Sequence, residues 1–188
     1  MAFAFVSGNP ALDLAGTRKW RNDAQPEELL RGAADLQRWL VEVADLAPDL
    51  PVDHTALEAA LALREAVYRL ASDRLQGVPF DPSDLAVVNA LAALPGVRVR
   101  LSPDRVERDG SAQNALADVA RSAISVLSDP DACLKECGRA SCTRIYLDRS
   151  RGARRTWCGM DECGNRVKAA AYRARKRVAA DTQAHVTT

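Results

Sequence analysis

The chain has 188 residues, of which 47% are hydrophobic and 5% aromatic, and its formal net charge is +1. This length fits one domain, or one medium domain with a small appendage, and the apolar content is sufficient for a buried core. No apolar run approaches the roughly 18 residues of a membrane-spanning helix, and residues 1–16 lack a basic start, so we expect a cytoplasmic protein with no membrane partner and no secretory signal.

Apolar residues recur at helical spacing along most of the first 128 residues, which predicts a mainly α domain. The expected helices are residues 26–46, 53–75, 81–94 and 112–129. Pro26 suits a first-turn position of the first helix, and Gly77 marks the end of the second. Asp81 or Ser83 is expected to cap the third helix.

Residues 97–110 switch to alternating apolar and polar side chains, which predicts a small β-hairpin that turns near residues 102–104. We find no catalytic constellation in this N-terminal part, because its carboxylates are scattered and no glycine-rich phosphate loop follows a strand. His54 is expected as a capping or surface residue. Trp20 and Trp39 are interpreted as core or domain-contact residues, with pocket lining as the alternative.

The last third of the chain differs in composition from the rest. Residues 135–178 carry 13 Lys and Arg against four Asp and Glu, a local net charge of +9, and the remainder carries −8. All five cysteines lie within residues 133–163. This asymmetry is typical of a polyanion-binding end on an acidic body. The predicted units are a helical domain (1–130), a cysteine-containing basic module (131–180) and a flexible tail (181–188).

Two Cys-x4-Cys pairs stand 15 residues apart: Cys137 with Cys142, and Cys158 with Cys163. Zinc prefers four soft or borderline ligands in a tetrahedron, and two short cysteine loops joined by a hairpin supply them. Residues 145–147 suit one strand of that hairpin and residues 156–157 its return strand, with Trp157 on the small core. A disulfide or redox dithiol, and a set of unrelated thiols, are the alternatives. Four cysteines would close the metal's coordination sphere, so we predict a protein that is not an enzyme.

Cys133 lies four residues before Cys137, so the two thiols would share a face if this segment were helical, and Cys133 would then be an alternative ligand. We interpret Cys133 as a buried non-ligand, because Cys137 completes the symmetrical spacing and Cys133 does not.

A helix rich in basic residues is expected after Cys163, because no helix breaker follows Gly164. The candidate nucleic-acid contacts are Arg166, Arg173 and Arg177, which share a face within about 40°, with Lys168, Arg175 and Lys176 beside them. No acids are interleaved to neutralise them, which favours polyanion contact over a solvated face. An apolar strip (Val167, Ala171, Ala174 and Val178) is expected to lie on the module or on the body. Asn165 would either read a base or hold the helix start; we favour the structural role.

The segment from Cys137 to Arg177 closely resembles the CGNR zinc-finger family, whose tetrapeptide is present as residues 163–166. Its Asp-x-Ser stretch is present as Asp148-Arg149-Ser150. Its Arg-Trp-Cys-x-Met run is present in residues 155–160 with one extra residue, so that either Arg154 or Arg155 takes the role of its Arg. The resemblance implies one structural zinc ion on Cys137, Cys142, Cys158 and Cys163, supported by Asp148, Ser150, Trp157 and Asn165.

Residues 5–17 and 35–46 are similar to the ABATE domain, which usually precedes this finger and is described as a stress-induced transcription regulator. Gly16 stands where that family usually has Asn, so no pocket role of the Asn transfers to this chain. The resemblance implies a zinc-containing, DNA-binding transcription regulator with a helical sensor or interaction domain. RNA binding and a protein-interaction module are the alternatives. A homodimer, and a small-molecule or protein signal at the N-terminal domain, are further expectations.

Overall fold

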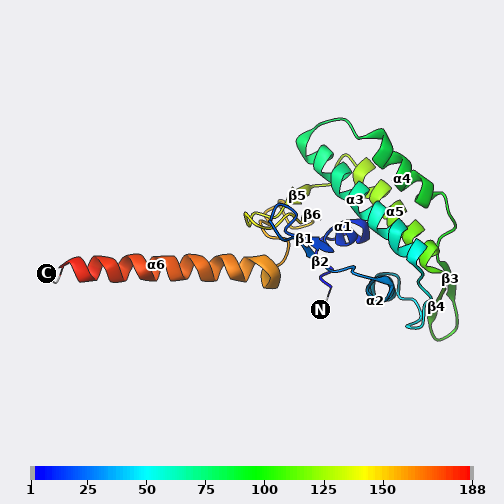
Figure 1. Ribbon diagram of the computed structural model, residues 1–188, viewed down its shortest axis with the longest axis horizontal. Helices are drawn as coiled ribbons and strands as arrows, with labels where there is room; N and C mark the ends of the chain where they lie inside the picture. Colours follow the sequence, from blue (N-terminus) through cyan, green and yellow to red (C-terminus); the bar gives the residue numbers. More distant parts are fainter. Residues whose placement is uncertain (1–2, 187–188) are drawn as a thin grey trace.

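The computed structural model describes the backbone of residues 3–186 and the side chains of residues 3–177. The described chain is mainly helical, with small antiparallel pairs of strands (Figure 1). The helices are α1 (Pro10–Ala15), α2 (Ala33–Ala44), α3 (His54–Gln76), α4 (Pro82–Ala92), α5 (Ala112–Ser128), the π-helical turn η1 (Met160–Gly164) and α6 (Asn165–Val186). The strands are β1 (Arg18–Lys19), β2 (Glu27–Glu28), β3 (Arg98–Leu101), β4 (Val106–Asp109), β5 (Leu134–Glu136) and β6 (Ile145–Leu147).

Helix α3 is the centre of the N-terminal domain and contacts α1, α2, α4 and α5 (Figure 1). Its apolar face and those of its neighbours bury a single core, in which Leu12, Trp39, Leu63 and Leu116 have no exposed surface. Burying side chains of this size removes enough apolar surface from water to stabilise the helical layer. The expected core position of Trp39 is confirmed.

Local signals place the ends of two predicted helices. The Asp53 carboxylate accepts a hydrogen bond from the amide of Ala56 (2.8 Å) before α3, and Gly77 ends α3 in the left-handed conformation that glycine adopts without a Cβ clash. Asp81 caps α4 by accepting from the amide of Ser83 (2.7 Å), which decides between the two predicted caps. The expected helices 53–75, 81–94 and 112–129 and the hairpin 97–110 are therefore confirmed.

The helix predicted over residues 26–46 is wrong in its first third. Residues 27–28 pair with residues 18–19 as β2 and β1, and α2 begins only after Gly32. The Glu28 carboxylate accepts hydrogen bonds from the amide of Leu30 (2.8 Å) and from buried Arg64 (2.6 Å), so a tertiary ion pair holds this segment outside the helix. Helix α1, which we did not predict, is short and begins where the Asn9 side chain caps it.

The strand predicted at residues 145–147 is confirmed, but its partner is not residues 156–157. β6 pairs with β5 instead, with Leu134 opposite Leu147. Residues 156–157 instead lie beside the first cysteine loop, because the Thr156 carbonyl accepts a hydrogen bond from the amide of Gly138 (2.9 Å). The apolar side chains of β5 and β6 explain this choice, because Leu134 and Ile145 join the core of the N-terminal domain.

Helix α6 projects away from the rest of the chain, beyond the cysteine loops (Figure 1). Ala171 and Ala174 are exposed, so the expectation that the apolar strip lies on the module or the body is wrong for these two positions, whereas Val167 is half-buried. The side chain of Val178 lies outside the described residues. The α6 backbone runs to Val186, through most of the segment expected as a flexible tail, because residues 179–186 contain no Gly or Pro to end it. Residues 187–188 lie outside the described residues. No helix in the described part of the chain has the length and apolar character needed to cross a membrane.

Candidate metal centre

Four cysteine sulfur atoms converge at one point on the C-terminal module: those of Cys137, Cys142, Cys158 and Cys163. All lie within 4.8 Å of one another, and the Sγ atom of Cys158 is 3.8 Å from that of Cys142 and 3.6 Å from that of Cys163. Zn–S bonds of about 2.3 Å in a tetrahedron place the sulfur atoms about 3.8 Å apart. The donor set and its spacing therefore fit one zinc ion.

The protonated thiols compete for hydrogen bonds within this cluster. Hydrogen bonds from Cys142 and Cys158 lower the pKa of Cys137, whereas donation to Cys137 raises the pKa of Cys142 to about 12 and, together with burial, raises that of Cys158. Four adjacent thiolates are therefore unfavourable without a cation. A divalent cation would reverse this preference, because each metal-bound thiol is deprotonated.

The cysteines are also most of the apolar core of the module. Cys137, Cys158 and Cys163 are buried with Tyr146, and Trp157 packs partly buried against them. Burial raises the pKa of Tyr146 to about 12, and its hydroxyl donates to the carbonyl of Arg155 (2.7 Å). A core this small stabilises little structure through apolar area alone, so metal binding would supply much of the folding free energy.

Asp148 organises the turn that carries the second cysteine pair. Its carboxylate accepts hydrogen bonds from the Lys135 ammonium (2.8 Å), from the hydroxyl (2.6 Å) and amide (2.9 Å) of Ser150, and from the amide of Arg155 (3.0 Å). The Lys135 and Ser150 hydrogen bonds hold the pKa of Asp148 well below its usual range. Lys135 also donates to the carbonyl of Ala153, so one cation joins β5, β6 and the turn.

Arg155 connects the second cysteine loop to the N-terminal segment. Its guanidinium donates to the carbonyls of Trp157 (2.8 Å), Cys158 and Val6 (2.6 Å), and lies 4.3 Å from the ring centroid of Tyr146. The side chain of Arg154 is exposed instead. Of the two arginines considered for the position before the Trp-Cys pair, Arg155 makes the contacts.

Cys133 stands apart from the cluster of four. It is half-buried rather than fully buried, so the expected burial is wrong in degree, and its carbonyl accepts from the amide of Asp148 (2.8 Å). The β5 strand explains both facts, because residues 133 and 137 flank an extended segment and do not share a helical face.

Two family models match the chain in sequence order. Residues 8–130 match ABATE, described as "Putative stress-induced transcription regulator", and residues 134–176 match the CGNR zinc finger. The chain belongs to the ABATE family. Its CGNR finger contains the four converging cysteines, which can hold one zinc ion. Neither family is an enzyme family, and comparison with the curated proteins found no match.

The CGNR tetrapeptide joins the last cysteine to α6. Cys163 lies in η1, and α6 begins two residues later at Asn165. Gly164 permits close packing at this joint, because a Cβ atom there would lie 2.6 Å from the Met160 Sδ and 3.1 Å from the Trp157 Cδ1. The Asn165 amide reaches the Asp161 carboxylate at 3.4 Å, which supports the structural role expected for it.

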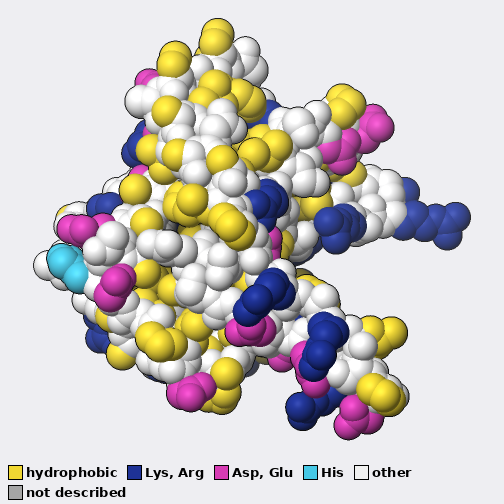
Figure 2. Space-filling view, turned by 90° about the vertical axis from the view of Figure 1, so that its right-hand side faces the viewer, with side chains coloured by type: hydrophobic (Ala, Val, Ile, Leu, Met, Phe, Trp, Pro, Cys, Tyr) yellow, Lys and Arg dark blue, Asp and Glu magenta, His cyan; other side chains and the backbone are white. Residues whose placement is uncertain are grey.

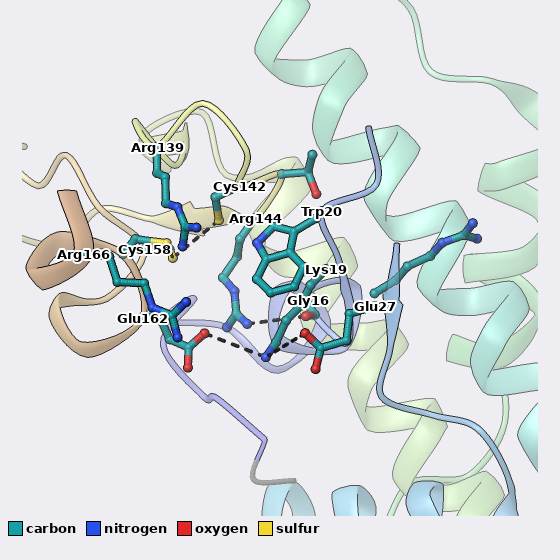
Figure 3. Close-up of a pocket in the computed structure, with 13 residues that line it drawn as sticks. Gly16, Lys19, Trp20, Glu27, Arg139, Cys142, Arg144, Cys158, Glu162 and Arg166 are labelled. Carbon is teal, nitrogen blue, oxygen red and sulfur yellow. Dashed lines mark hydrogen bonds and ion pairs between the residues drawn. The ribbon is translucent and has the colours of Figure 1, made fainter. Parts of the chain in front are cut away.

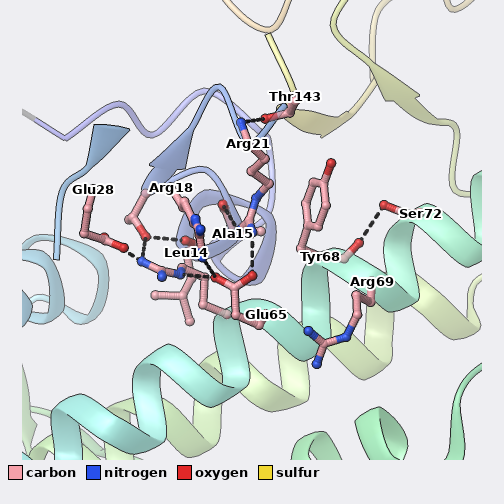
Figure 4. Close-up of polar contacts among 12 residues, drawn as sticks. Leu14, Ala15, Arg18, Arg21, Glu28, Glu65, Tyr68, Arg69, Ser72 and Thr143 are labelled. Carbon is pink, nitrogen blue, oxygen red and sulfur yellow. Dashed lines mark hydrogen bonds and ion pairs between the residues drawn. The ribbon is translucent and has the colours of Figure 1, made fainter. Parts of the chain in front are cut away.

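A network of buried and half-buried charges fixes the β1–β2 segment of the ABATE domain against α3 and against the finger (Figure 4). Glu65 pairs with Arg21 (2.5 Å) and Arg64 (2.9 Å), and Arg21 stacks 4.0 Å from the ring centroid of Tyr68. The Arg21 amide donates to the Thr143 hydroxyl (3.1 Å) just after the first cysteine pair. Sequence reasoning missed these residues, because single charges in helical segments look like a solvated face.

Arg144 is a second link that the sequence did not reveal. Its buried guanidinium donates to the carbonyls of Ala4 (2.7 Å) and Gly16 (3.4 Å). A Cβ atom at Gly16 would lie 3.1 Å from the Arg144 Cζ, so glycine leaves room for this arginine. Trp20, expected in the core or at a domain contact, is half-buried and lines a pocket beside Arg144. Because residues of the finger line the same pocket, this position fits both the domain-contact interpretation of Trp20 and the alternative of pocket lining.

Proposed function

We propose that this protein is a transcription regulator in which the zinc-stabilised finger presents α6 to duplex DNA. The main observation in support of this proposal is the positive charge on the exposed part of α6. Its six basic side chains are exposed and have no acidic partner within 4.0 Å among residues 3–177: Arg166, Lys168, Arg173, Arg175, Lys176 and Arg177.

The opposite side of the molecule differs from α6 in that its basic side chains lie among acidic ones. On the face of the ABATE domain that points away from α6, Lys and Arg alternate with Asp and Glu (Figure 2). The arginines of the β3–β4 hairpin pair with acids there, as in Arg98 with Asp109 and Arg100 with Glu107. Unpaired cations attract phosphates, whereas paired cations contribute little net field.

A shallow groove runs beside the first turns of α6. Arg139 from the first cysteine loop lies on one side, and Arg166 and Arg173 lie on the helix side. Ala169 and Ala170 form the groove wall between the helix arginines, and their small side chains permit close approach of a sugar–phosphate backbone. The main phosphate or base contacts in this proposal are Arg166, Arg173 and Arg177.

A catalytic role has less support. Four cysteine ligands would leave no coordination position for substrate, and the two family models are those of a transcription regulator and a zinc finger rather than of an enzyme. The proposal therefore assigns the metal a structural role and assigns the chemistry of recognition to α6.

The test is duplex binding by the zinc-loaded chain, measured by fluorescence anisotropy over a range of salt concentrations. Replacing Arg166, Arg173 and Arg177 by Ala should weaken binding and reduce the slope of log K against log salt by about three. The matched control replaces Arg98, Arg100 and Arg105, which removes the same charge from the exposed hairpin and should change affinity little.

Two results would contradict the proposal. Equal loss of affinity in both triple variants would assign binding to net charge rather than to α6. Tighter binding of an RNA duplex than of a DNA duplex of equal length would assign the surface to RNA. Selection from a random DNA pool then tests regulation, because a sequence-specific regulator must enrich a site.

A further inference from the structure

A pocket of about 230 Å³ lies between the ABATE domain and the CGNR finger (Figure 3). Lys19, Trp20 and Glu27 line it from the β1–β2 segment, and Arg139, Arg144 and Arg166 line it from the finger side. Three of the clustered cysteines contribute to its wall. The pocket is therefore next to the proposed metal and next to the start of α6, and it is formed only when both units are folded together.

The cations of this pocket exceed its anions. Lys19 lies 3.9 Å from both Glu27 and Glu162, so its single charge offsets one of the two lining carboxylates. Arg144 donates only to main-chain carbonyls. The side chains of Arg139 and Arg166 have no hydrogen-bond or ion-pair partner among residues 3–177. The lining holds five cations (Arg18, Lys19, Arg139, Arg144 and Arg166) against Glu27, Glu162 and the two negative charges of a zinc tetrathiolate, which leaves a net charge of +1 and favours an anion.

The wall of the pocket opposite the finger arginines is formed by the indole ring of Trp20. Trp20 adopts a left-handed backbone conformation with φ of 50°, which is strained for a bulky side chain and persists only where the surroundings enforce it. The hydrogen bond from the Arg21 amide to Thr143 contributes to that enforcement. The indole stands above Lys19 and faces the cavity, with its ring centroid 6.0 Å from the Lys19 ammonium (Figure 3).

We propose that this pocket binds a small aromatic carboxylate. The ring would lie on the Trp20 indole, and the carboxylate would take the free guanidinium donors of Arg139 or Arg166, which match it in a two-point geometry. The volume is below that of pockets for drug-sized ligands, which span about 300–1,000 Å³, and so suits a single ring with one acidic group.

The pocket and the α6 groove share two side chains, because Arg139 and Arg166 line both. A carboxylate in the pocket would neutralise part of the charge that attracts a phosphate in the groove. Bound ligand should therefore weaken duplex binding. This coupling rests on the proposed function, whereas ligand binding itself does not.

The pocket is tested first without DNA. Isothermal calorimetry of benzoate into the zinc-loaded full chain should show one site with a Kd of about 1 mM or tighter. Trp20→Ala and Arg139→Ala should each weaken binding by about tenfold, and Arg149→Ala, which removes an exposed arginine that lines neither cavity, should not. Unchanged zinc content and circular dichroism identify the variants that remain folded.

Two further probes make the ligand class falsifiable. Benzamide, a neutral analogue of similar shape, should bind at least tenfold more weakly than benzoate, and inorganic phosphate should do the same. Equal binding of benzamide would overturn the role of charge, and equal binding of phosphate would overturn the role of the aromatic ring. Absence of saturable benzoate binding to the folded chain would overturn the proposal as a whole.

The coupling is tested by duplex affinity with and without benzoate. Saturating benzoate should weaken duplex binding several-fold in the unmodified chain and should have no effect on Trp20→Ala, whose duplex affinity without benzoate should be normal. Benzoate binding without any duplex binding would contradict the proposed function and leave the ligand site supported. A duplex affinity that is the same with and without bound benzoate would contradict the coupling alone.

Discussion

The guanidinium of Arg155 lies between the second cysteine loop and the first residues of the chain, where it donates to the carbonyl of Val6 at 2.6 Å. The same side chain holds the carbonyls of Trp157 and Cys158. Residues far apart in the sequence are thereby tied to one planar group. The finger is consequently braced by the ABATE domain in addition to its metal.

Replacing Arg155 with Ala should lower the free energy of unfolding of the zinc-loaded chain by about 2–4 kcal/mol, because three carbonyl acceptors lose a charged donor and Tyr146 loses its stacking partner. Urea denaturation measures this. Arg154→Ala, at the exposed neighbouring position, should change stability by less than about 0.5 kcal/mol. Similar losses for the two variants would show that Arg155 acts through charge alone.

Each cysteine of the cluster should be required for stoichiometric metal. Replacing Cys137, Cys142, Cys158 or Cys163 singly with Ser should lower zinc affinity by more than about 100-fold, because loss of a direct ligand exceeds the effect of losing a supporting contact. Zinc content by mass spectrometry after dialysis under reducing conditions measures this. Cys133→Ser is the control and should retain one zinc ion per chain. Loss of zinc from Cys133→Ser would assign that residue to the site.

The Glu65 network should make part of the stability depend on pH. Burial raises the pKa of Glu65, but the hydrogen bond and charge of Arg21 and the charge of Arg64 outweigh it, so that the folded-state pKa is lowered. A lowered pKa means that the contribution is fully present above the unfolded pKa of about 4.3 and is lost as pH falls through the folded value. Glu65→Gln should therefore cost about 2 kcal/mol at pH 7 and progressively less below pH 4.

The comparison of unmodified chain and variant at each pH isolates this contribution, since acid release of zinc affects both. The control is Glu58→Gln, which replaces an exposed glutamate on the same helix. This variant and the unmodified chain should have the same free energy of unfolding at pH 7 and at pH 3. A Glu65→Gln cost that stays constant from pH 7 to pH 3 would show that packing, rather than the ion pairs, holds this segment.

The features that could be predicted from sequence are those with local causes. The cap at Asp81, the alternating residues of β3–β4 and the matched cysteine spacing each depend on a few neighbouring residues. The features that could not be predicted depend on distant partners. Glu28 is in a strand because Arg64 reaches it from α3, and β6 pairs with β5 because Leu134 and Ile145 enter a core built by other helices.

The same distinction applies to the candidate site. The spacing of the four cysteines predicts them as metal ligands, whereas nothing in the sequence distinguishes Lys135, Arg144 and Arg155 from the other residues of a basic segment. Their roles follow from carbonyl oxygens that belong to other parts of the chain. Counting these arginines and lysines as surface charge overstates the charge available to a polyanion, which is concentrated on α6.

The continuous passage from η1 into α6 makes the helix a lever. At about 1.5 Å per residue, its 22 residues span about 33 Å, so a tilt of about 10° at η1 would move the far end by about 6 Å. Successive phosphates of one DNA strand are spaced by about 3.4 Å along the helix axis. At Arg177, 12 residues from the start of α6, the same tilt gives a shift of about 3 Å, close to the axial spacing of one nucleotide, so the alignment of this arginine with a phosphate depends on the stiffness of the joint at Cys163.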